Sequence, residues 1–187
     1  VYEQIAEDFP KSIYHSQAAL KAGKIQFEGK QYAKARAMLK STAQKKGDPN
    51  QPLAIYYLGF TEAEAGETDE AIVWLEQLAR EFPKDPNASE ARMKVGELQI
   101  SAKKFDAAQK TYEKFLSEFP KHKRADDAHY YLGGAQVGLE QWDAAIKSFQ
   151  SVGKSSEWRT EALYQSAWCE RKAGRAADAW KQYEALI

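Results

Sequence analysis

Residues 126–152 read DDAHYYLGGAQVGLEQWDAAIKSFQSV. Two apolar stripes run through this segment, and the residues in each recur at intervals of three and four, which is the spacing of one face of an α-helix. The stripes are Ala128, Tyr131, Leu132 and Ala135, and then Trp142, Ala145, Ile146, Phe149 and Val152. Because Gly133 has no side chain to hold two helices apart at their crossing, the segment predicts a closely packed antiparallel helix pair.

The same pattern recurs along the whole chain. Gly133 has counterparts at Gly96 and Gly59, each 37 residues earlier than the last, then at Gly23 after a further 36, and at Ala167 in the following copy. A period of this size indicates stacked repeats, because each unit is too small to bury its apolar face alone. We therefore predict an all-α solenoid of antiparallel helix pairs.

These positions resemble the tetratricopeptide repeat (TPR), whose unit carries a Leu-Gly pair, an Ala-x3-aromatic pair and a closing proline. The matching residues are Leu58-Gly59 and Leu132-Gly133, then Ala108/Tyr112, Ala145/Phe149 and Ala179/Tyr183, and finally Pro83 and Pro120. The chain departs from the family at its second Tyr position, which holds Gln or Glu in every copy. The resemblance covers essentially the whole chain and implies a right-handed superhelical solenoid.

The repeat boundaries follow from the period. We predict a single array over residues 1–187, with a half repeat and junction at 1–15 and five repeats at 16–50, 51–86, 87–121, 122–153 and 154–187. The first ten residues match the second helix of a repeat, and the last residues fall inside another second helix. The sequence therefore reads as a fragment truncated at both ends, so the lack of a targeting segment carries no information.

Composition argues against several classes of function. The chain has 27 basic and 27 acidic residues and thus no net charge, which argues against a nucleic-acid-binding surface. No apolar run approaches the length of a membrane-spanning helix. Cys169 is the only cysteine, so no internal disulfide can form, and its place within a predicted helix favours a buried filler over a reactive thiol.

Charge is unevenly divided between the first two complete repeats. Residues 16–50 carry eight Lys and Arg against two acidic residues, whereas residues 51–86 carry eight acidic residues against two basic ones. One interpretation is complementary charge between neighbouring repeats, with each surface pair worth less than ~1 kcal/mol. The other is a bipolar surface that orients a charged partner.

Three junctions between repeats contain a Phe-Pro pair followed by five residues, at Phe9-Pro10, Phe82-Pro83 and Phe119-Pro120. Proline ends the preceding helix. The junctions at 46–50 and 151–156 lack the pair. The lengthened junction resembles repeats of bacterial envelope proteins, such as the periplasmic coordinator associated with the Tol-Pal system and the lipoprotein of the outer-membrane barrel-assembly machine. This resemblance implies a periplasmic or outer-membrane-associated location.

No constellation of side chains predicts catalysis, a cofactor or a metal. His122 and His129 stand seven residues apart with no third ligand between them, whereas a zinc site needs a fuller set. Asp126 and Asp127 are adjacent, so they point to different faces of a helix and lack the paired geometry of acid–base catalysis. We therefore predict a protein that is not an enzyme and that uses no cofactor.

The TPR resemblance also implies a binding surface. In that family the first helix of each repeat lines a concave groove, and the positions carried over to this chain form an aromatic and apolar series. The predicted groove residues are Tyr56, Phe60, Met93, Glu97, Tyr130, Tyr164, Trp168 and Arg171. Such a series suits an extended or helical peptide with apolar side chains.

Alternatives exist for both the site and the function. Tyr56, Tyr130 and Tyr164 recur at one repeat position, so they could equally stack between repeats as core. Phe60 and Trp168 favour a ligand surface more strongly, because their position varies from Lys to Gly among the repeats. A non-catalytic scaffold for a protein or peptide partner, with no nucleic acid bound, is the first function. A structural module that self-associates, for example as a homodimer, is the second.

Overall fold

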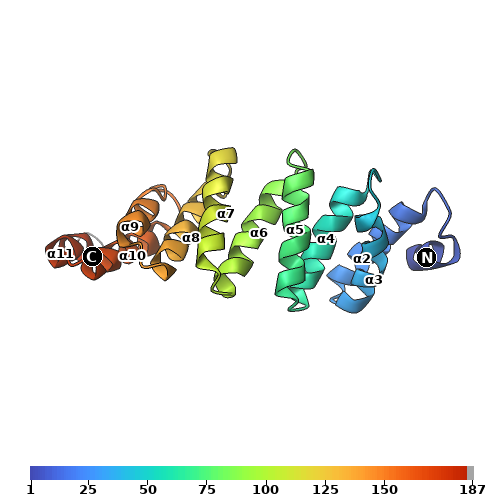
Figure 1. Cartoon of the computed structure of the whole chain (residues 1–187), viewed down its shortest axis with the longest axis horizontal. Helices are drawn as coiled ribbons and strands as arrows, with labels where there is room; N and C mark the ends of the chain where they lie inside the picture. The colour runs from blue at the N-terminus through green and yellow to red at the C-terminus, as the bar shows by residue number, and fades with distance from the viewer. Residues whose placement is uncertain (185–187) are drawn as a thin grey trace. The chain divides into compact units, whose positions relative to one another are not determined.

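The computed structural model describes residues 1–184, and within that range it consists of helices and turns with no strand. Eleven α-helices succeed one another along the described chain (Figure 1). They are α1 (Tyr2–Asp8), α2 (His15–Glu28), α3 (Tyr32–Gln44), α4 (Gln51–Glu64), α5 (Thr68–Glu81), α6 (Ala88–Ser101), α7 (Phe105–Glu118), α8 (Ala125–Gly138), α9 (Trp142–Gln150), α10 (Arg159–Lys172) and α11 (Ala176–Glu184). The predicted all-α class is confirmed. None of these helices is long and apolar enough to cross a membrane.

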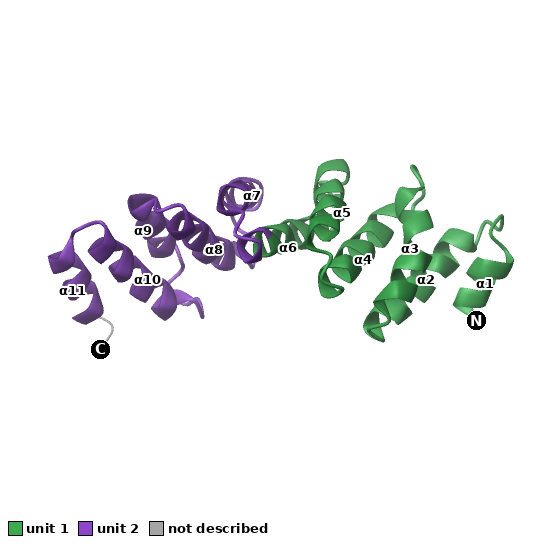
Figure 2. Ribbon diagram, turned by 60° about the horizontal axis from the view of Figure 1, so that its bottom comes forward, with its two compact units in different colours: residues 1–98 green, residues 99–187 purple. Residues whose placement is uncertain are grey.

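The chain forms two compact units, residues 1–98 (unit 1) and residues 99–187 (unit 2), shown in different colours in Figure 2. Unit 1 contains α1 to α5 and most of α6. Unit 2 contains the end of α6 and α7 to α11.

In unit 1, α4 packs against both α3 and α5. The core between them contains Leu39, Leu58 and Leu75, none of which has any exposed surface. Gly59 lies at the crossing of α4 and α5, where an added Cβ would stand 2.6 Å from the Leu75 side chain. The small residue is therefore required at this position by close helix packing.

Unit 2 repeats this arrangement around α8, α9 and α10. Phe149 of α9 is 2% exposed and packs over Gly133, where an added Cβ would lie 2.6 Å from the Phe149 ring. The predicted close crossing at Gly133 is thus confirmed. Cys169 is fully buried in the same core, as the sequence predicted.

The turn inside each helix pair depends on one residue with a left-handed backbone. Gly66 and Gly174 occupy this position with φ of 85° and 84°. Lys30, Lys103 and Glu140 occupy it in the other copies, with φ between 56° and 58°. Left-handed backbone is costly for residues with a Cβ, so the turn geometry is imposed by the packing of the two helices rather than by the local residue.

The junctions between pairs all adopt one turn, including the two that lack Phe-Pro. In each, one side chain accepts a hydrogen bond from the backbone N–H two residues later, over 2.8–3.2 Å. The accepting residues are Ser12, Asp48, Asp85, His122 and Ser156. These residues follow the repeat period, and they share the ability to accept a local hydrogen bond. The distinction that the sequence suggested between two kinds of junction is therefore not a distinction in backbone structure.

Candidate partner-binding surfaces

Three aromatic side chains lie together on α4 of unit 1. Tyr56 meets Tyr57 edge to face, with ring centroids 5.4 Å apart, and its centroid lies 4.6 Å from that of Phe60. All three rings are half-buried, because one side of each packs against the core around Leu58. Lys94 of α6 adds a cation whose Nζ lies 5.8 Å from the Phe60 ring centroid. We name Tyr56, Tyr57, Phe60 and Lys94 the α4 surface.

Charges of both signs border the α4 surface. Lys94 Nζ lies 3.9 Å from a carboxylate oxygen of Glu64 and 3.9 Å from one of Glu97. Lys24 Nζ lies 5.7 Å from the ring centroid of Tyr57, and a hydrogen bond to Tyr57 is the main cause that raises the pKa of Lys24. A partner that contacts these rings would therefore meet cations held beside aromatic faces.

The equivalent tyrosine on α8 in unit 2 is half-buried too, but one face of its ring is stacked on an indole. Tyr130 stacks on Trp158 with ring centroids 4.4 Å apart and planes 21° apart, and the Tyr131 centroid lies 5.7 Å from the same indole. Trp158 stands directly before α10, and its Nε1 donates a hydrogen bond of 3.2 Å to Asp127. The other Asp127 oxygen accepts a hydrogen bond of 2.8 Å from Arg124, which fixes the carboxylate. One face of Tyr130 therefore packs against the residue that precedes α10, while the side chain as a whole remains half-buried.

The aromatic residues of α10 are more open. Tyr164 is 49% exposed, and its ring centroid lies 5.5 Å from that of Tyr183. Trp168 follows one turn later and is half-buried, with its centroid 5.6 Å from that of Trp142. Lys172 Nζ lies 5.1 Å from the Trp168 ring centroid. We name Tyr164, Trp168 and Lys172 the α10 surface.

The predicted groove residues thus fall into separate groups within the two units. Tyr56 and Phe60 lie on the α4 surface with Glu97 at its border, and Tyr164 and Trp168 lie on the α10 surface beside the exposed Arg171. Burial is the largest cause that raises the pKa of both Tyr56 and Tyr130, so these hydroxyls stay protonated and able to donate hydrogen bonds at neutral pH.

Met93 does not lie on a surface. Its side chain has no exposed area, so it cannot contact a partner in this structure. Methionine is flexible and polarisable and commonly fills irregular gaps in a core, which is a sufficient reason for its presence here. The placement of Met93 among the groove residues was therefore wrong.

Two residues at these surfaces, Tyr57 and Trp158, were not predicted from the repeat pattern. The Tyr-Tyr pair of α4 recurs in α8, and this repetition was a signal that both tyrosines have a role. Trp158 corresponds to Tyr14 in the first junction and to Asn50, Asn87 and Arg124 in the others, so the repeat pattern gave no consistent aromatic residue at this position. Only the structure shows that Trp158 stacks on Tyr130.

The Gln or Glu that replaces the family's second Tyr makes buried hydrogen bonds. In unit 2, Gln136 is 5% exposed and its Oε1 accepts a hydrogen bond of 2.7 Å from Ser148. In unit 1, Glu62 is 4% exposed and accepts a hydrogen bond of 2.7 Å from Nε of Arg36 on α3. These hydrogen bonds connect neighbouring helices and satisfy the polar atoms of the buried side chains.

Few described groups are suited to covalent or metal chemistry. Burial, with a smaller effect of Glu170, raises the pKa of the Cys169 thiol to about 11, so the reactive thiolate is scarce at neutral pH. Within residues 1–184, no three His, Cys, Asp or Glu side chains are placed to hold a metal ion. What the α4 and α10 surfaces offer is contact through aromatic faces, hydroxyl groups and adjacent cations, which are typical of binding hot spots.

Comparison with solved structures places the fold among TPR-like helical solenoids. A crystal structure of MamA matches with a TM-score of 0.76 at 19% identity, over 91% of this chain and 89% of that one. MamA from Desulfovibrio magneticus RS-1, residue 41 to the end, matches with a TM-score of 0.73 at 17% identity, over 91% and 92% of the two chains. A Podospora anserina putative kinesin light chain with TPR-like repeats gives 0.65 at 13% identity, over 91% and 92%. At these identities the likeness shows the fold alone.

Comparison with protein families is more specific. A tetratricopeptide-repeat profile matches residues 17–45, which confirms the resemblance drawn from the sequence. A comparison with curated proteins gave no significant match. The profile of YfiO, an outer membrane lipoprotein, matches residues 48–187, which is most of the chain. The chain therefore belongs to the YfiO outer membrane lipoprotein family.

Proposed function

We propose that this chain is a non-catalytic scaffold that binds a protein or peptide partner through the α4 and α10 surfaces, within a bacterial envelope assembly. The repeat fold is that of protein-interaction scaffolds, and membership of an outer membrane lipoprotein family favours a periplasmic or outer-membrane-associated location. The observation that carries the proposal is the exposure of aromatic side chains on the first helices of repeats, above all the 49% exposure of Tyr164.

The chemistry of the two surfaces indicates the kind of partner. Tyrosine and tryptophan rings supply large, rigid contact areas at a small cost in side-chain entropy, and their polar tips can still hydrogen-bond. The cations Lys94 and Lys172 stand over ring faces, so the same surfaces can accept a backbone carbonyl or carboxylate beside an apolar side chain. An extended or helical segment with apolar side chains fits both surfaces.

A capture experiment from a cell-envelope extract tests this function. The immobilised protein is compared with a Tyr164→Ala/Trp168→Ala variant and with Trp180→Ala, which removes an indole that is 64% exposed on α11. Circular dichroism first establishes that all three are folded. We expect the captured partner to be lost in the double variant and retained in Trp180→Ala. Equal capture by all three proteins would place binding elsewhere.

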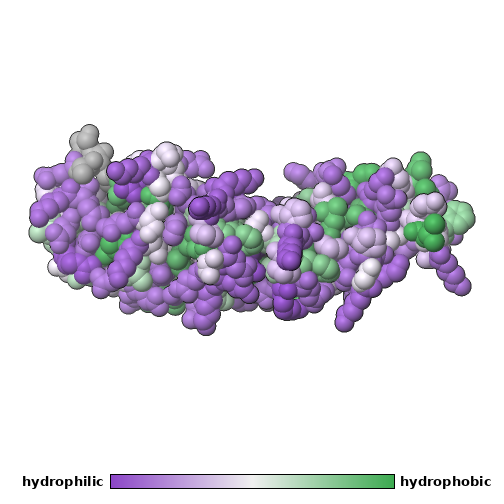
Figure 3. Space-filling model, turned by 90° about the horizontal axis from the view of Figure 1, so that it is seen from above, coloured by the Kyte–Doolittle hydropathy of each residue, from purple (hydrophilic) through white to green (hydrophobic). Residues whose placement is uncertain are grey.

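Self-association is a second candidate function, and exposed apolar side chains in unit 1 support it. Ile13, Tyr14 and Phe9 are 87%, 63% and 61% exposed, and Figure 3 shows apolar atoms at this N-terminal end of the unit. Exposed apolar groups of this kind often mark association sites. Light scattering over a range of concentrations would show dimers that dissociate in an Ile13→Asp variant. A monomer at every concentration would remove this candidate.

A further inference from the structure

A hollow opens between α3 and α5 of unit 1, with α4 as its floor, and its volume is about 460 Å³. Trp74 of α5 lines it and is half-buried, because part of the indole packs against the core of unit 1. The corresponding residues of the next two repeats are Thr111 and Ser148, whose hydroxyls donate hydrogen bonds to glutamine side chains. In the repeat at 51–86 this position therefore presents an aromatic wall where the next two repeats have a small hydroxyl group.

The charges around the hollow do not balance. Arg36 and Glu62 form a close ion pair on its floor, with an Nε to Oε1 distance of 2.7 Å, and the Arg36 guanidinium also lies 4.0 Å from a carboxylate oxygen of Glu67. The other charged residues that line the hollow are Lys40 and Glu70. Three carboxylates thus share the hollow with two cations, which leaves an excess of one negative charge.

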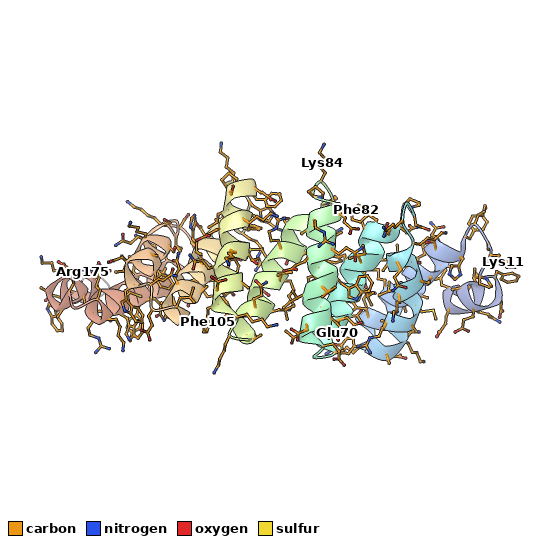
Figure 4. The ribbon with its side chains drawn as sticks, in the orientation of Figure 1. Lys11, Glu70, Phe82, Lys84, Phe105 and Arg175 are labelled. Atoms are coloured by element: carbon orange, nitrogen blue, oxygen red, sulfur yellow. The ribbon has the colours of Figure 1, made fainter. Side chains whose placement is uncertain are left out.

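A second, shallower depression of about 220 Å³ adjoins the first and shares Glu70 and Trp74 with it. Figure 4 shows Glu70 near the N-terminal end of α5. Val73 lines this depression and is 63% exposed. An aromatic ring and an aliphatic side chain are therefore bordered by carboxylates, in a repeat that has eight acidic residues and two basic ones over residues 51–86.

From this arrangement we propose that the hollow between α3 and α5 is a docking site for a basic segment of a partner protein, with a Lys or Arg side chain of that segment resting on Trp74. A cation over an indole face is attracted by the ring, and Arg and Lys stems also pack well on apolar surface. Glu67 and Glu70 complement the positive charge, and Val73 accepts an apolar neighbour of the basic residue. None of these residues belongs to the α4 or α10 surface, so the site is a further one beyond the proposed function.

Fluorescence anisotropy with a labelled amphipathic peptide, acetyl-KLRLKLRL-amide, tests the site at physiological salt. We expect saturable binding that weakens about tenfold in Glu70→Lys, because the new cation repels the peptide where a carboxylate attracted it. Glu113→Lys is the matched control: Glu113 is exposed on the second helix of the next repeat, and the change in net charge is the same. This control should bind as the unaltered protein does. Trp74→Leu, which keeps an apolar wall without the ring, should weaken binding by about threefold.

Three results would overturn the proposal. One is the absence of saturable binding to the unaltered protein. Another is an equal loss in Glu70→Lys and Glu113→Lys, which would mean that the peptide responds only to net charge. The third is equal affinity for the same peptide with Glu in place of Lys and Arg. Since the capture experiment alters only α10, failure of this site and failure of the proposed function can be told apart.

Discussion

Helices α4 and α8 occupy the same place in two repeats, yet they present their aromatic residues differently. Tyr56 of α4 and Tyr130 of α8 correspond in the repeat, but Tyr56 is extended by Phe60, whereas α8 has Gly134 at that position. Trp158 then stacks on one face of Tyr130. Both tyrosines are half-buried, so the two helices differ in what their tyrosines contact rather than in how deeply these lie. The difference teaches that a repeat position does not by itself decide which side chain packs on the ring, because that partner can come from outside the helix.

The same two helices also differ in their buried polar residue. Glu62 of α4 is paired with a cation from the preceding repeat, whereas Gln136 of α8 is paired with a hydroxyl group from its own repeat. A buried carboxylate requires a positively charged partner, while a buried amide does not. The two solutions therefore cannot be exchanged without a loss of stability.

Of the changes considered, exchanging the buried polar residue of α8 should have the largest effect on the free energy of unfolding. Gln136→Glu buries a carboxylate whose partner in this structure is the Ser148 hydroxyl, and we expect the free energy of unfolding to fall by about 3 kcal/mol at pH 7. Burial raises the folded-state pKa of such a carboxyl, so the loss should shrink as pH falls toward ~4.3, the unfolded value. Urea unfolding at pH 7 and pH 4 measures the loss of stability and its dependence on pH. Glu62→Gln, which leaves Arg36 partly solvated, should cost less, and a smaller cost for Gln136→Glu than for Glu62→Gln would contradict the comparison.

Removing the indole that stacks on Tyr130 should have the next largest effect on stability. Trp158→Ala removes the stacking on Tyr130 and the hydrogen bond to Asp127, and we expect a loss of about 2–3 kcal/mol. Trp180→Ala is the control, because an indole that is 64% exposed should cost less than ~0.5 kcal/mol. Thermal or urea unfolding distinguishes the two. Similar losses would show that the contacts of Trp158 with Tyr130 and Asp127 do not stabilise unit 2.

The sequence predicted the helix class, the repeat period and the close crossings at Gly23, Gly59 and Gly133, because these follow from the spacing of residues along the chain. It also placed Phe60 and Trp168 on the first helices, where both are half-buried. It could not predict that Met93 is fully buried or that Trp158 stacks on Tyr130. Periodicity assigns a residue to a face of its own helix, whereas burial depends on which side chain of another helix or junction reaches that face.

The adjacent glycines of α8 separate packing from helix propensity. Gly133→Ala should destabilise the protein by about 1–3 kcal/mol, because the added Cβ meets the Phe149 ring. Gly134→Ala should stabilise it by about 0.5–1 kcal/mol, since nothing lies within 4 Å of the added Cβ and alanine favours the helix. Parallel unfolding curves test the pair. Shifts of the same sign would show that the open space at Gly134 is not real.

The smallest expected effect on stability concerns the junctions, where the two units use different side chains in the same turn. Asp48 in unit 1 and Ser156 in unit 2 hold the same turn. Burial raises the pKa of Asp48, but hydrogen bonds from Ser16, the Asn50 backbone and Lys45 outweigh it and leave that pKa lowered. Because the pKa of Asp48 is lower in the folded state than in the unfolded state, its carboxylate stabilises the fold at neutral pH. This contribution is lost as the pH falls through the folded-state pKa of Asp48.

Asp48→Asn should therefore cost about 1 kcal/mol at pH 7 and progressively less in acid, below the ordinary Asp pKa near ~3.9. Ser156→Ala should cost a similar amount at every pH, because a hydroxyl group does not titrate in this range. Unfolding at pH 7 and at pH 3 compares them. A pH-independent cost for Asp48→Asn would mean that its charge does not stabilise the turn.

The exposure of the first-helix aromatic residues is the basis of the proposed function, and photo-crosslinking in the cell envelope tests it most directly. A photoreactive phenylalanine analogue replaces Tyr164 on the α10 surface in one protein and Trp180 on α11 in another, two sites that are 49% and 64% exposed. The scaffold account predicts a discrete crosslinked partner from position 164 that is absent from position 180. No product at 164, or the same products at both positions, would contradict it.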